Sequence, residues 1–288
     1  GNELHILSKS IFMRKVSNMP HCDCKLFYAP LNSYMKAIDL KQAIEICKQP
    51  FVYVREKLRP KTTYSQHNED LVLRLLLGNV DRFIDVGANN GRSASNTFLF
   101  AIQGATGLCF EPVPLTYSLL SSLYLLNRKV RCFQVAISDK DGFVTIQEEN
   151  LLSFIPETQD PWGKAHLTKF MSGVQHLVKV KCSTLRYWID RFPTFCLTDV
   201  ISIDVEGHEL SVLNGIDFES THAKCIVIET MKEMHQDYHE ITAVLSSYGY
   251  KSVLRNSMNT FWFTVNSCPD GKALLDICTS FPGYEILL

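Results

Sequence analysis

Three almost continuously apolar segments constrain the fold more than any other feature of the sequence. They span residues 83–86, 200–205 and 225–228, and each has the length of a strand. Strands that are apolar on both faces are typical of a parallel sheet covered by helices on both sides. Two further strand candidates, at 107–110 and 130–136, also alternate with helical stretches. The alternation therefore predicts an α/β fold with a doubly wound, mostly parallel sheet.

The two ends of the chain differ from this alternating region. Residues 251–254 and 260–265 predict a C-terminal antiparallel strand pair. Near the N-terminus, apolar residues over 40–47 have helical spacing. Prolines punctuate the rest of that segment, at Pro20, Pro30, Pro50 and Pro60. We therefore predict a partly helical N-terminal extension or cap over residues 1–60 and one domain over residues 61–288.

Three local patterns refine the predicted domain. Ser65 is a candidate cap for a helix over residues 71–77. Residues 143–147 follow an Asp-Gly turn signal and predict a short strand outside the main sheet. Residues 148–176 are rich in proline and glycine, and an insertion of this length is usually functional or disordered. We interpret it as a possible substrate lid.

The turn after the first predicted strand indicates a ligand site. Gly87-Ala-Asn-Asn-Gly91 joins a strand to a helix, where nucleotides often bind, but its spacing is not the G-x-G-x-x-G of dinucleotide sites. The Asp85 carboxylate would repel a pyrophosphate but attract an ammonium group. Glu111, about 20 residues further on, is placed to accept two ribose hydroxyls. These demands fit S-adenosylmethionine (SAM); a structural glycine turn beside a solvated glutamate is the alternative.

The charge balance limits the possible partners. The chain has 29 basic and 30 acidic residues and a net charge of -1. A general binder of nucleic acid or of an anionic membrane would carry a basic surplus, although a local basic patch stays possible. No run of 18 apolar residues occurs, so the sequence predicts no membrane span.

Ten cysteines leave the compartment open. Four of them fall in predicted strands and are interpreted as small buried hydrophobes, namely Cys109, Cys132, Cys182 and Cys225. The other six could form disulfides only in an oxidising compartment. The sequence has no Asn-x-Ser/Thr glycosylation site. We therefore favour a cytoplasmic location, with the lumen of the secretory pathway as the alternative if an upstream anchor has been removed.

Five sequence blocks follow one another along the chain. They are Ser65-Gln66-x-x-Glu69-Asp70, Phe83-Ile84-Asp85-Val86-Gly87-Ala88-Asn89-x-Gly91, Glu111-Pro112-x-Pro114, Val135-Ala136-Ile137-Ser138-Asp139 and Ile203-Asp204-Val205-Glu206-Gly207-x-Glu209. Taken together, these blocks resemble the FkbM family of SAM-dependent methyltransferases. The resemblance implies a Rossmann-like class I methyltransferase fold with a seven-stranded sheet and SAM as the methyl donor. It also implies an O-methyltransferase that acts on a hydroxyl of a sugar or of a macrocyclic natural product.

The resemblance also assigns roles to individual residues. The methionine part of SAM is expected among Asp85, Gly87, Asn89 and Gly91. Glu111 is expected to hold the ribose, Ser138 to lie near the adenine, and Gln66 and Glu69 to close over the cofactor. Two positions depart from the family pattern. Asn68 stands in place of a glycine but tolerates a left-handed backbone, and Arg186 stands in place of an aspartate, which puts a charge-based contact there in doubt.

Acidic residues and a histidine gather after the buried strand that ends near residue 203. His208 is a candidate general base because its ordinary pKa lies near working pH, and Asp204 is the alternative if burial raises its pKa. Asp204 and Glu229 could instead hold Mg²⁺ or Mn²⁺, with Glu206 or His208 completing the ligand set. A purely structural role, in which Glu206 and Glu209 cap the next helix, is a further alternative.

Other polar and aromatic residues carry weaker signals. In or beside the insertion, Phe154, Trp162, His166, Phe170 and His176 could contact a sugar or only pack the loop. His235 and His239 lie four apart on a predicted helix without an HExxH motif, so a solvated helix face is favoured.

The sequence thus leads to a SAM-dependent O-methyltransferase for a hydroxyl of a sugar within a glycan. The balanced charge suits such a neutral acceptor. An O-methyltransferase for a small polyketide or lipid, and a non-catalytic binding module that keeps the fold, are the alternatives. The expected partner is a glycan or a small hydroxyl acceptor, and no nucleic acid is expected. The acceptor, the oligomeric state and any need for a metal stay open.

Overall fold

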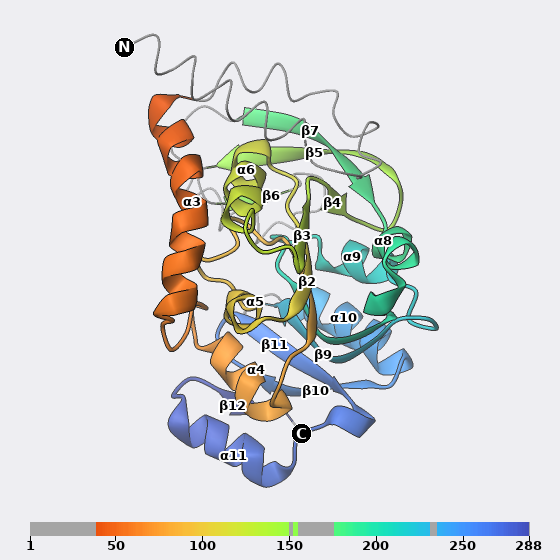
Figure 1. Ribbon diagram of the computed structural model, residues 1–288. Coiled ribbons are helices and arrows are strands. Elements are labelled where there is room, and N and C mark those ends of the chain that lie inside the picture. Colours follow the sequence, from red (N-terminus) through yellow and green to blue (C-terminus); the bar gives the residue numbers. More distant parts are fainter. Residues whose placement is uncertain (1–38, 150–151, 155–175, 231–234, 288) are drawn as a thin grey trace. The chain divides into compact units, whose positions relative to one another are not determined.

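The computed structural model describes residues 39–149, 152–154, 176–230 and 235–287 (Figure 1). One compact unit spans Lys41–Leu288 and contains every strand within the described ranges. The predicted boundary at residue 61 stays a prediction, because most of residues 1–60 lie outside the described ranges.

A mostly parallel sheet forms the centre of the unit. Its strands, in spatial order, are β12 (Glu285–Ile286), β10 (Tyr250–Arg255), β11 (Asn259–Thr264), β9 (His222–Glu229), β8 (Leu197–Ile203), β1 (Arg82–Val86), β2 (Thr106–Phe110) and β3 (Val130–Phe133). The five strands from β9 to β3 are parallel, and β11 and β10 each run antiparallel to their neighbour. The predicted Rossmann-like fold and its C-terminal antiparallel pair are confirmed. The two-residue strand β12 makes the sheet eight-stranded instead of the expected seven.

Helices cover both faces of this sheet (Figure 1). On one side lie α3 (Leu40–Leu58), α4 (Glu69–Leu77), α5 (Phe98–Gln103), α6 (Pro114–Leu123) and α11 (Gly271–Ser280); on the other lie α8 (Leu185–Arg191), α9 (Glu209–Asn214) and α10 (His235–Ser247). The first group shares one apolar core with the sheet, in which Phe83 and Phe263 are fully buried. Burial of both sheet faces explains the continuous apolar runs of the parallel strands.

A second, four-stranded sheet lies beyond the end of β3. Its order is β4 (Ala136–Ile137), β7 (His176–Ser183), β5 (Gly142–Glu149) and β6 (Leu152–Phe154). The strand predicted outside the main sheet is therefore confirmed. The single strand predicted over residues 130–136 is wrong, because the chain leaves β2 after Phe133 and pairs Ala136 with Cys182 instead. Most of the predicted insertion, residues 155–175, lies outside the described residues.

Helix α3 continues through Pro50, where the sequence predicted an interruption. A proline cannot donate the N–H that would bond the carbonyl of the residue four positions earlier. That carbonyl belongs to Ile46, and the hydroxyl of Ser122 on α6 donates to it at 2.8 Å. The side chain of a distant helix therefore replaces the missing backbone donor, which lets α3 run for 19 residues.

Helix α4 begins differently from the prediction. The residue before its first turn is Asn68, in a left-handed conformation with φ 67°, as its occupation of a glycine position suggested. Ser65 is not the residue directly before the helix, but its hydroxyl oxygen accepts from the first-turn N–H of Asp70 at 3.3 Å, so it does satisfy one N–H at the start of α4. Its hydroxyl donates to Asp70 Oδ1 at 2.9 Å, and Asp70 also accepts from the backbone N–H of Tyr64 at 2.8 Å. Asp70 thus fixes the chain that leads into α4.

The eight cysteines within the described ranges are free thiols. Cys109, Cys182 and Cys225 are buried, and Cys132 is partly buried, as expected for strand residues. Cys22 and Cys24 lie outside the described residues. Among the helices that the structure describes, none is both long and apolar enough to cross a membrane.

Candidate active site

The glycine loop after β1 is held tightly against the end of β8. Gly87 has φ 83°, and a Cβ atom placed on it would lie 1.7 Å from the carbonyl oxygen of Asp204. Gly91 has φ 78°, and its Cβ would lie 2.5 Å from Leu120 Cδ1. Between them, Asn89 takes φ 49°. Only glycine meets both the positive φ and the missing space, which explains the G-x-x-x-G spacing.

The two acids predicted to face the cofactor flank this loop. Glu111 follows β2, and its two carboxylate oxygens accept from Asn89 N at 3.0 Å and from Val113 N at 2.8 Å. Asp85, within β1, accepts from Thr97 Oγ1 at 2.6 Å. Burial, reinforced by the nearby Asp204 carboxylate, raises the pKa of Asp85 to about 7. The orientation of both acids is therefore fixed by the protein itself.

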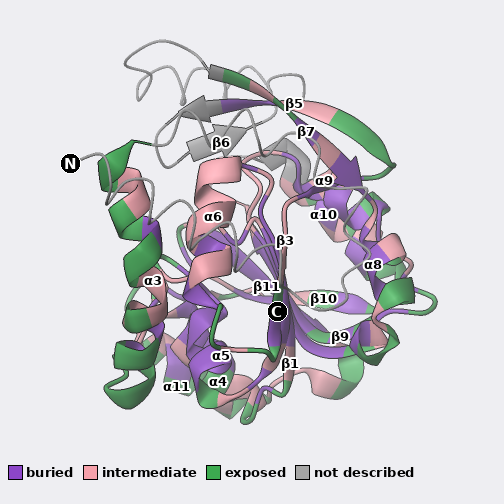
Figure 2. Cartoon of the chain, turned by 45° about the horizontal axis from the view of Figure 1, so that its top comes forward, coloured by how far each residue is buried: buried purple, intermediate pink, exposed green. Residues whose placement is uncertain are grey.

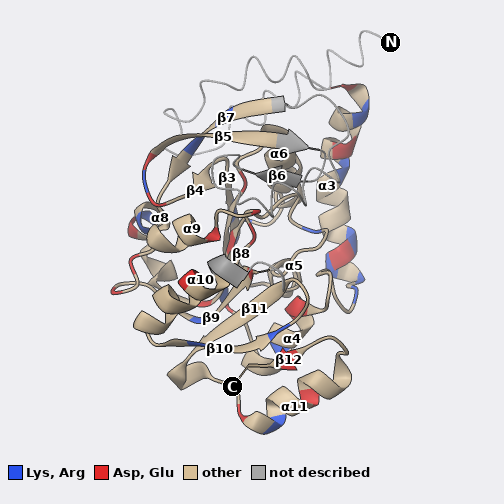
Figure 3. Ribbon diagram, turned by 180° about the vertical axis from the view of Figure 1, so that it is seen from behind, with Lys and Arg blue, Asp and Glu red and all other residues tan. Residues whose placement is uncertain are grey.

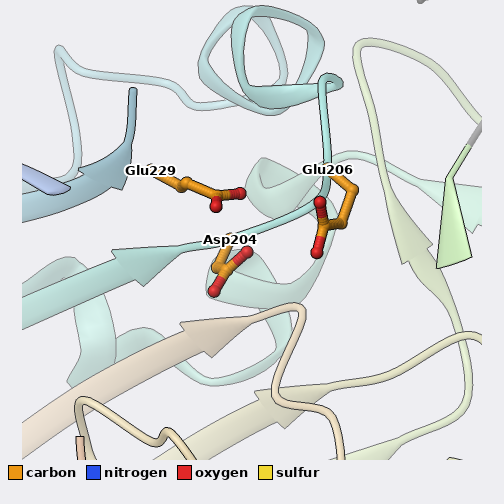
Figure 4. A group of neighbouring side chains, drawn as sticks. All are labelled: Asp204, Glu206 and Glu229. Atoms are coloured by element: carbon orange, nitrogen blue, oxygen red, sulfur yellow. The ribbon is translucent and has the colours of Figure 1, made fainter. Parts of the chain in front are cut away.

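A cluster of three carboxyl groups lies at the carboxyl ends of β8 and β9 (Figure 4). Asp204 and Glu206 follow β8, Glu229 ends β9, and one oxygen of each lies within 4.8 Å of the others. The register that pairs Ile203 with Ile228 brings the two strand ends together. Figure 4 shows the three side chains pointing toward a shared space. The sequence prediction that these acids meet is confirmed in geometry.

Burial and mutual repulsion raise the pKa values of this carboxyl cluster. Glu206 reaches a pKa of about 8, through burial first and then through Asp204 and Glu209. Burial raises the pKa of both Asp204 and Glu229, and a hydrogen bond between them lowers the pKa of Asp204 but raises that of Glu229. Within this pair, Glu229 is therefore the residue that keeps a proton, and Asp204 ionises before it. A cation beside the cluster would favour ionisation of all three.

Glu209 braces the loop that carries these acids. Its Oε1 accepts from the backbone N–H groups of Val205 at 3.2 Å and Gly207 at 3.1 Å. Glu206 lies between them with φ 55°, a left-handed conformation that the brace maintains. Glu209 thus has a structural role, but it differs from the predicted helix cap because its partners lie in the loop before α9. Glu206 points into the carboxyl cluster (Figure 4).

His208 does not join the carboxyl cluster. Its Nε2 lies 2.9 Å from the hydroxyl of Ser138, which donates to Asp139 Oδ1 at 3.0 Å. Nε2 is then the protonated nitrogen, and burial lowers the pKa of the ring, which keeps it neutral. Among the described residues, His208 Nδ1 has no hydrogen-bond partner although it is buried. Its free lone pair can accept from a ligand donor.

The segment predicted to close over the cofactor is anchored to the turn between β10 and β11, beside the end of β9 where Asn259 pairs with Glu229. Glu69 is fully buried and accepts from the side-chain amides of Asn256 at 2.8 Å and Asn259 at 2.9 Å. The neighbouring Gln66 is exposed. Asn256 and Asn259 were missed from the sequence, where they formed only a turn between two strands. A turn rich in asparagine beside a strand end was the available signal.

The remaining candidates contribute little to this site. Trp162, His166 and Phe170 lie outside the described residues, as do the side chains of Phe154, His176 and His235. His239 is exposed on α10, in line with the predicted solvated face. Arg186 lies 3.7 Å from Asp217, an ion pair that the family aspartate could not form.

The donor set fits SAM by its chemistry. The acids Asp85 and Glu111 flank the glycine loop. SAM carries two positive charges that such acids would stabilise, one on its sulfonium and one on its amino group. Glu111 offers charge-assisted acceptors for hydroxyl groups, and His208 Nδ1 offers an acceptor for an amino group such as that of adenine.

Comparisons with known proteins identify one family model and several similar solved structures. A family model described as "Methyltransferase FkbM domain" matches residues 85–252, more than half of the chain. No curated protein matches the chain. Among solved structures, an FkbM methyltransferase from Methylobacillus flagellatus KT is similar over 64% of this chain and 44% of that chain, with 15% identity and a TM-score of 0.43. A putative O-methyltransferase from Klebsiella pneumoniae is similar over 81% of this chain and 96% of that chain, with 9% identity and a TM-score of 0.38.

Proposed function

The chain belongs to the FkbM family of methyltransferases, and on that premise we propose that it moves the methyl group of SAM to a hydroxyl oxygen of a sugar within a glycan. The observation that supports this best is the carboxyl cluster of Asp204, Glu206 and Glu229 at the strand ends. An alcohol needs a base before it attacks carbon, and a carboxyl group with a raised pKa is such a base near neutral pH.

In this proposal, one group of residues removes the proton of the acceptor and another binds the methyl donor. Asp204, ionised while Glu229 holds the shared proton, accepts the proton of the acceptor hydroxyl. Asp85, Gly87, Asn89 and Gly91 enclose the methionine part of the donor, which supplies a methyl group on a sulfonium. The new oxygen–carbon bond forms as the sulfur–carbon bond breaks, and the bond electrons return to sulfur. A positioned base contributes roughly 10²–10⁴-fold to such a step.

On the cofactor side, Glu111 holds the ribose and the Ser138–His208 pair lies at the adenine. Ser138 is tied to Asp139, and His208 Nδ1 is the buried acceptor left for the adenine amino group. This gives His208 a binding role in place of the general-base role first considered for it. Gln66 and Glu69 lie at the edge of the sheet as part of the closing segment.

A divalent ion is the second use that we consider for the same cluster. Asp204 and Glu229, with Glu206, present the oxygen ligands that Mg²⁺ and Mn²⁺ prefer. The ion would act on acceptor hydroxyls, because the donor is already cationic. If a metal takes this role, chelation abolishes transfer and added Mn²⁺ restores it; if Asp204 acts alone, chelation leaves the rate unchanged.

Transfer of a labelled methyl group from SAM to a panel of neutral glycans tests the proposal. The wild-type chain should label a glycan, and Asp204→Asn should reduce kcat by roughly 10²-fold or more while S-adenosylhomocysteine still binds. Asp276→Asn, an exposed carboxylate on α11, is the matched control and should keep full activity. Labelling of a polyketide or lipid hydroxyl but of no glycan would replace the acceptor class. Absence of any transfer with intact SAM binding would favour a binding module.

A further inference from the structure

Helix α3 carries a second apolar surface that the fold does not use. One face packs inward through Ile46 and Tyr53, both buried. A separate row of apolar side chains recurs every three or four residues on the outward face. This outer stripe consists of Leu40, Ile44, Cys47, Phe51, Val54 and Leu58. All six are exposed, and Phe51 and Leu58 keep 77% and 76% of their surface (Figure 2).

The spacing of the outer stripe keeps it straight along the helix. From Leu40 to Leu58 it advances by four, three, four, three and four residues, a mean of 3.6 per turn. That mean equals the period of an undistorted α-helix, so the stripe does not wind around the axis. Because α3 is packed against the fold through Ile46 and Tyr53, the straight outer stripe can contact a flat surface along its whole length.

Basic residues border the outer stripe (Figure 3). Lys41, Lys48 and Arg55 each follow a stripe residue by one position and form a parallel row. Beyond them, residues 55–61 hold four cations, Arg55, Lys57, Arg59 and Lys61, around the protruding Leu58. These cations are exposed, in a chain whose net charge is only -1.

Nearby acids only partly offset this charge. Glu45 pairs with Lys48 at 3.4 Å on the exposed side. Glu56 is buried and pairs with both Arg55 at 2.6 Å and Arg92 at 2.9 Å, so its charge is already balanced from inside the fold. The surface around the outer stripe therefore stays net basic.

We propose that α3 lies on an anionic lipid bilayer, with the outer stripe in the headgroup boundary and the bordering Lys and Arg side chains on the phosphates. Apolar residues with phenylalanine and leucine on one face and cations beside them are the pattern of an interfacial helix. A second copy of the chain would bring the same net basic surface and be repelled. The helix lies on the bilayer and does not cross it.

Sedimentation of the full chain with lipid vesicles tests the proposal. Vesicles of phosphatidylcholine with phosphatidylserine should bind the protein, and vesicles of phosphatidylcholine alone should bind it weakly. Lys57→Glu with Arg59→Glu should weaken binding by roughly 30-fold or more, since the loss of each cation near the surface alone costs about fivefold and each new carboxylate is repelled. Phe51→Ser with Leu58→Ser should weaken binding by about tenfold or more. Raised salt should lower the affinity of the wild-type chain.

Leu275→Ser and Lys272→Glu on α11 are matched controls, because both residues are exposed away from the outer stripe. They should bind vesicles as the wild type does. Equal affinity for vesicles with and without phosphatidylserine would overturn the proposal. Unchanged affinity in the variant that combines Phe51→Ser with Leu58→Ser would overturn it as well. So would a wild-type dimer in sedimentation equilibrium that these two substitutions dissociate, because a second copy would then cover the stripe. All variants should keep their affinity for S-adenosylhomocysteine. A loss of vesicle binding can then be distinguished from a failure of the proposed methyl transfer.

Discussion

Replacing Gly87 by alanine should damage the molecule far more than the same change at another glycine with positive φ. The backbone at Gly87 has φ 83°, which costs an alanine roughly 1–2 kcal/mol. Its Cβ would also lie 1.7 Å from the Asp204 carbonyl oxygen, so the two must separate by a further 1.7 Å to reach the 3.4 Å of ordinary contact. Forcing such a shift in a packed site costs roughly 1–3 kcal/mol more. The sum is a loss of about 2–5 kcal/mol in unfolding free energy.

Gly249 supplies the matched control. Its φ is 79°, and a Cβ placed there meets nothing within 4 Å, so Gly249→Ala should lose only the roughly 1–2 kcal/mol of backbone strain. Urea unfolding followed by tryptophan fluorescence measures both variants. Methyl transfer should also fall by about 10²-fold or more in Gly87→Ala, because reacting groups misplaced by about 1 Å lose that much rate. Equal losses of stability in the two variants would refute the argument from close packing.

Three other predictions follow from single contacts. Ser122→Ala leaves the Ile46 carbonyl without its donor and should lower the unfolding free energy by about 1 kcal/mol, measured in urea. Asp85 has a pKa of about 7 in the folded chain against 3.8 ordinarily, so the unfolding free energy should fall as pH rises from about 4 to 7. Asp85→Asn should make that fall shallower in unfolding curves taken across this range. Glu111→Ala should weaken S-adenosylhomocysteine binding by roughly 10- to 100-fold in calorimetry, because charge-assisted acceptors for the ribose are lost.

The first two of these have a control in the chain. In a Pro50→Ala background, the restored backbone N–H can bond Ile46, so Ser122→Ala should become nearly neutral; an equal cost in both backgrounds contradicts the account. Asp276→Asn on the surface of α11 should leave the pH slope unchanged. A wild-type stability that rises between pH 4 and 7 speaks against buried Asp85, and unchanged affinity in Glu111→Ala speaks against the ribose assignment.

The sequence predicts the parts of this molecule that depend on local rules. Continuous apolar strands need two covered faces, so the parallel sheet and its order of elements follow from composition along the chain. The position of Asp204 beside Glu229 also follows, because parallel strand ends meet at one edge. Asn68 is readable too, since few residues tolerate its left-handed backbone.

Structural features that depend on contacts between residues far apart in the sequence cannot be predicted from local patterns. The residues near Pro50 do not indicate that the Ser122 hydroxyl replaces the missing N–H donor to the Ile46 carbonyl. The departure of Ala136 from the main sheet depends on Cys182, a strand partner 46 positions later. The hydrogen bonds between Glu69 and the amides of Asn256 and Asn259 join residues 187 and 190 positions apart, so the sequence left these asparagines in a turn with no partner assigned.

The bond from Ser122 to Ile46 has a consequence for the newly made protein. Translation delivers residue 46 well before residue 122, and the two are 76 positions apart. While the chain is still on the ribosome, α3 therefore has a gap in its ladder of hydrogen bonds at Pro50. The helix becomes complete only when α6 has been synthesised and docked. Helix α3 thus leaves the ribosome before α6 but reaches its final form only together with it, and a fragment that stops before Ser122 lacks the donor for the Ile46 carbonyl.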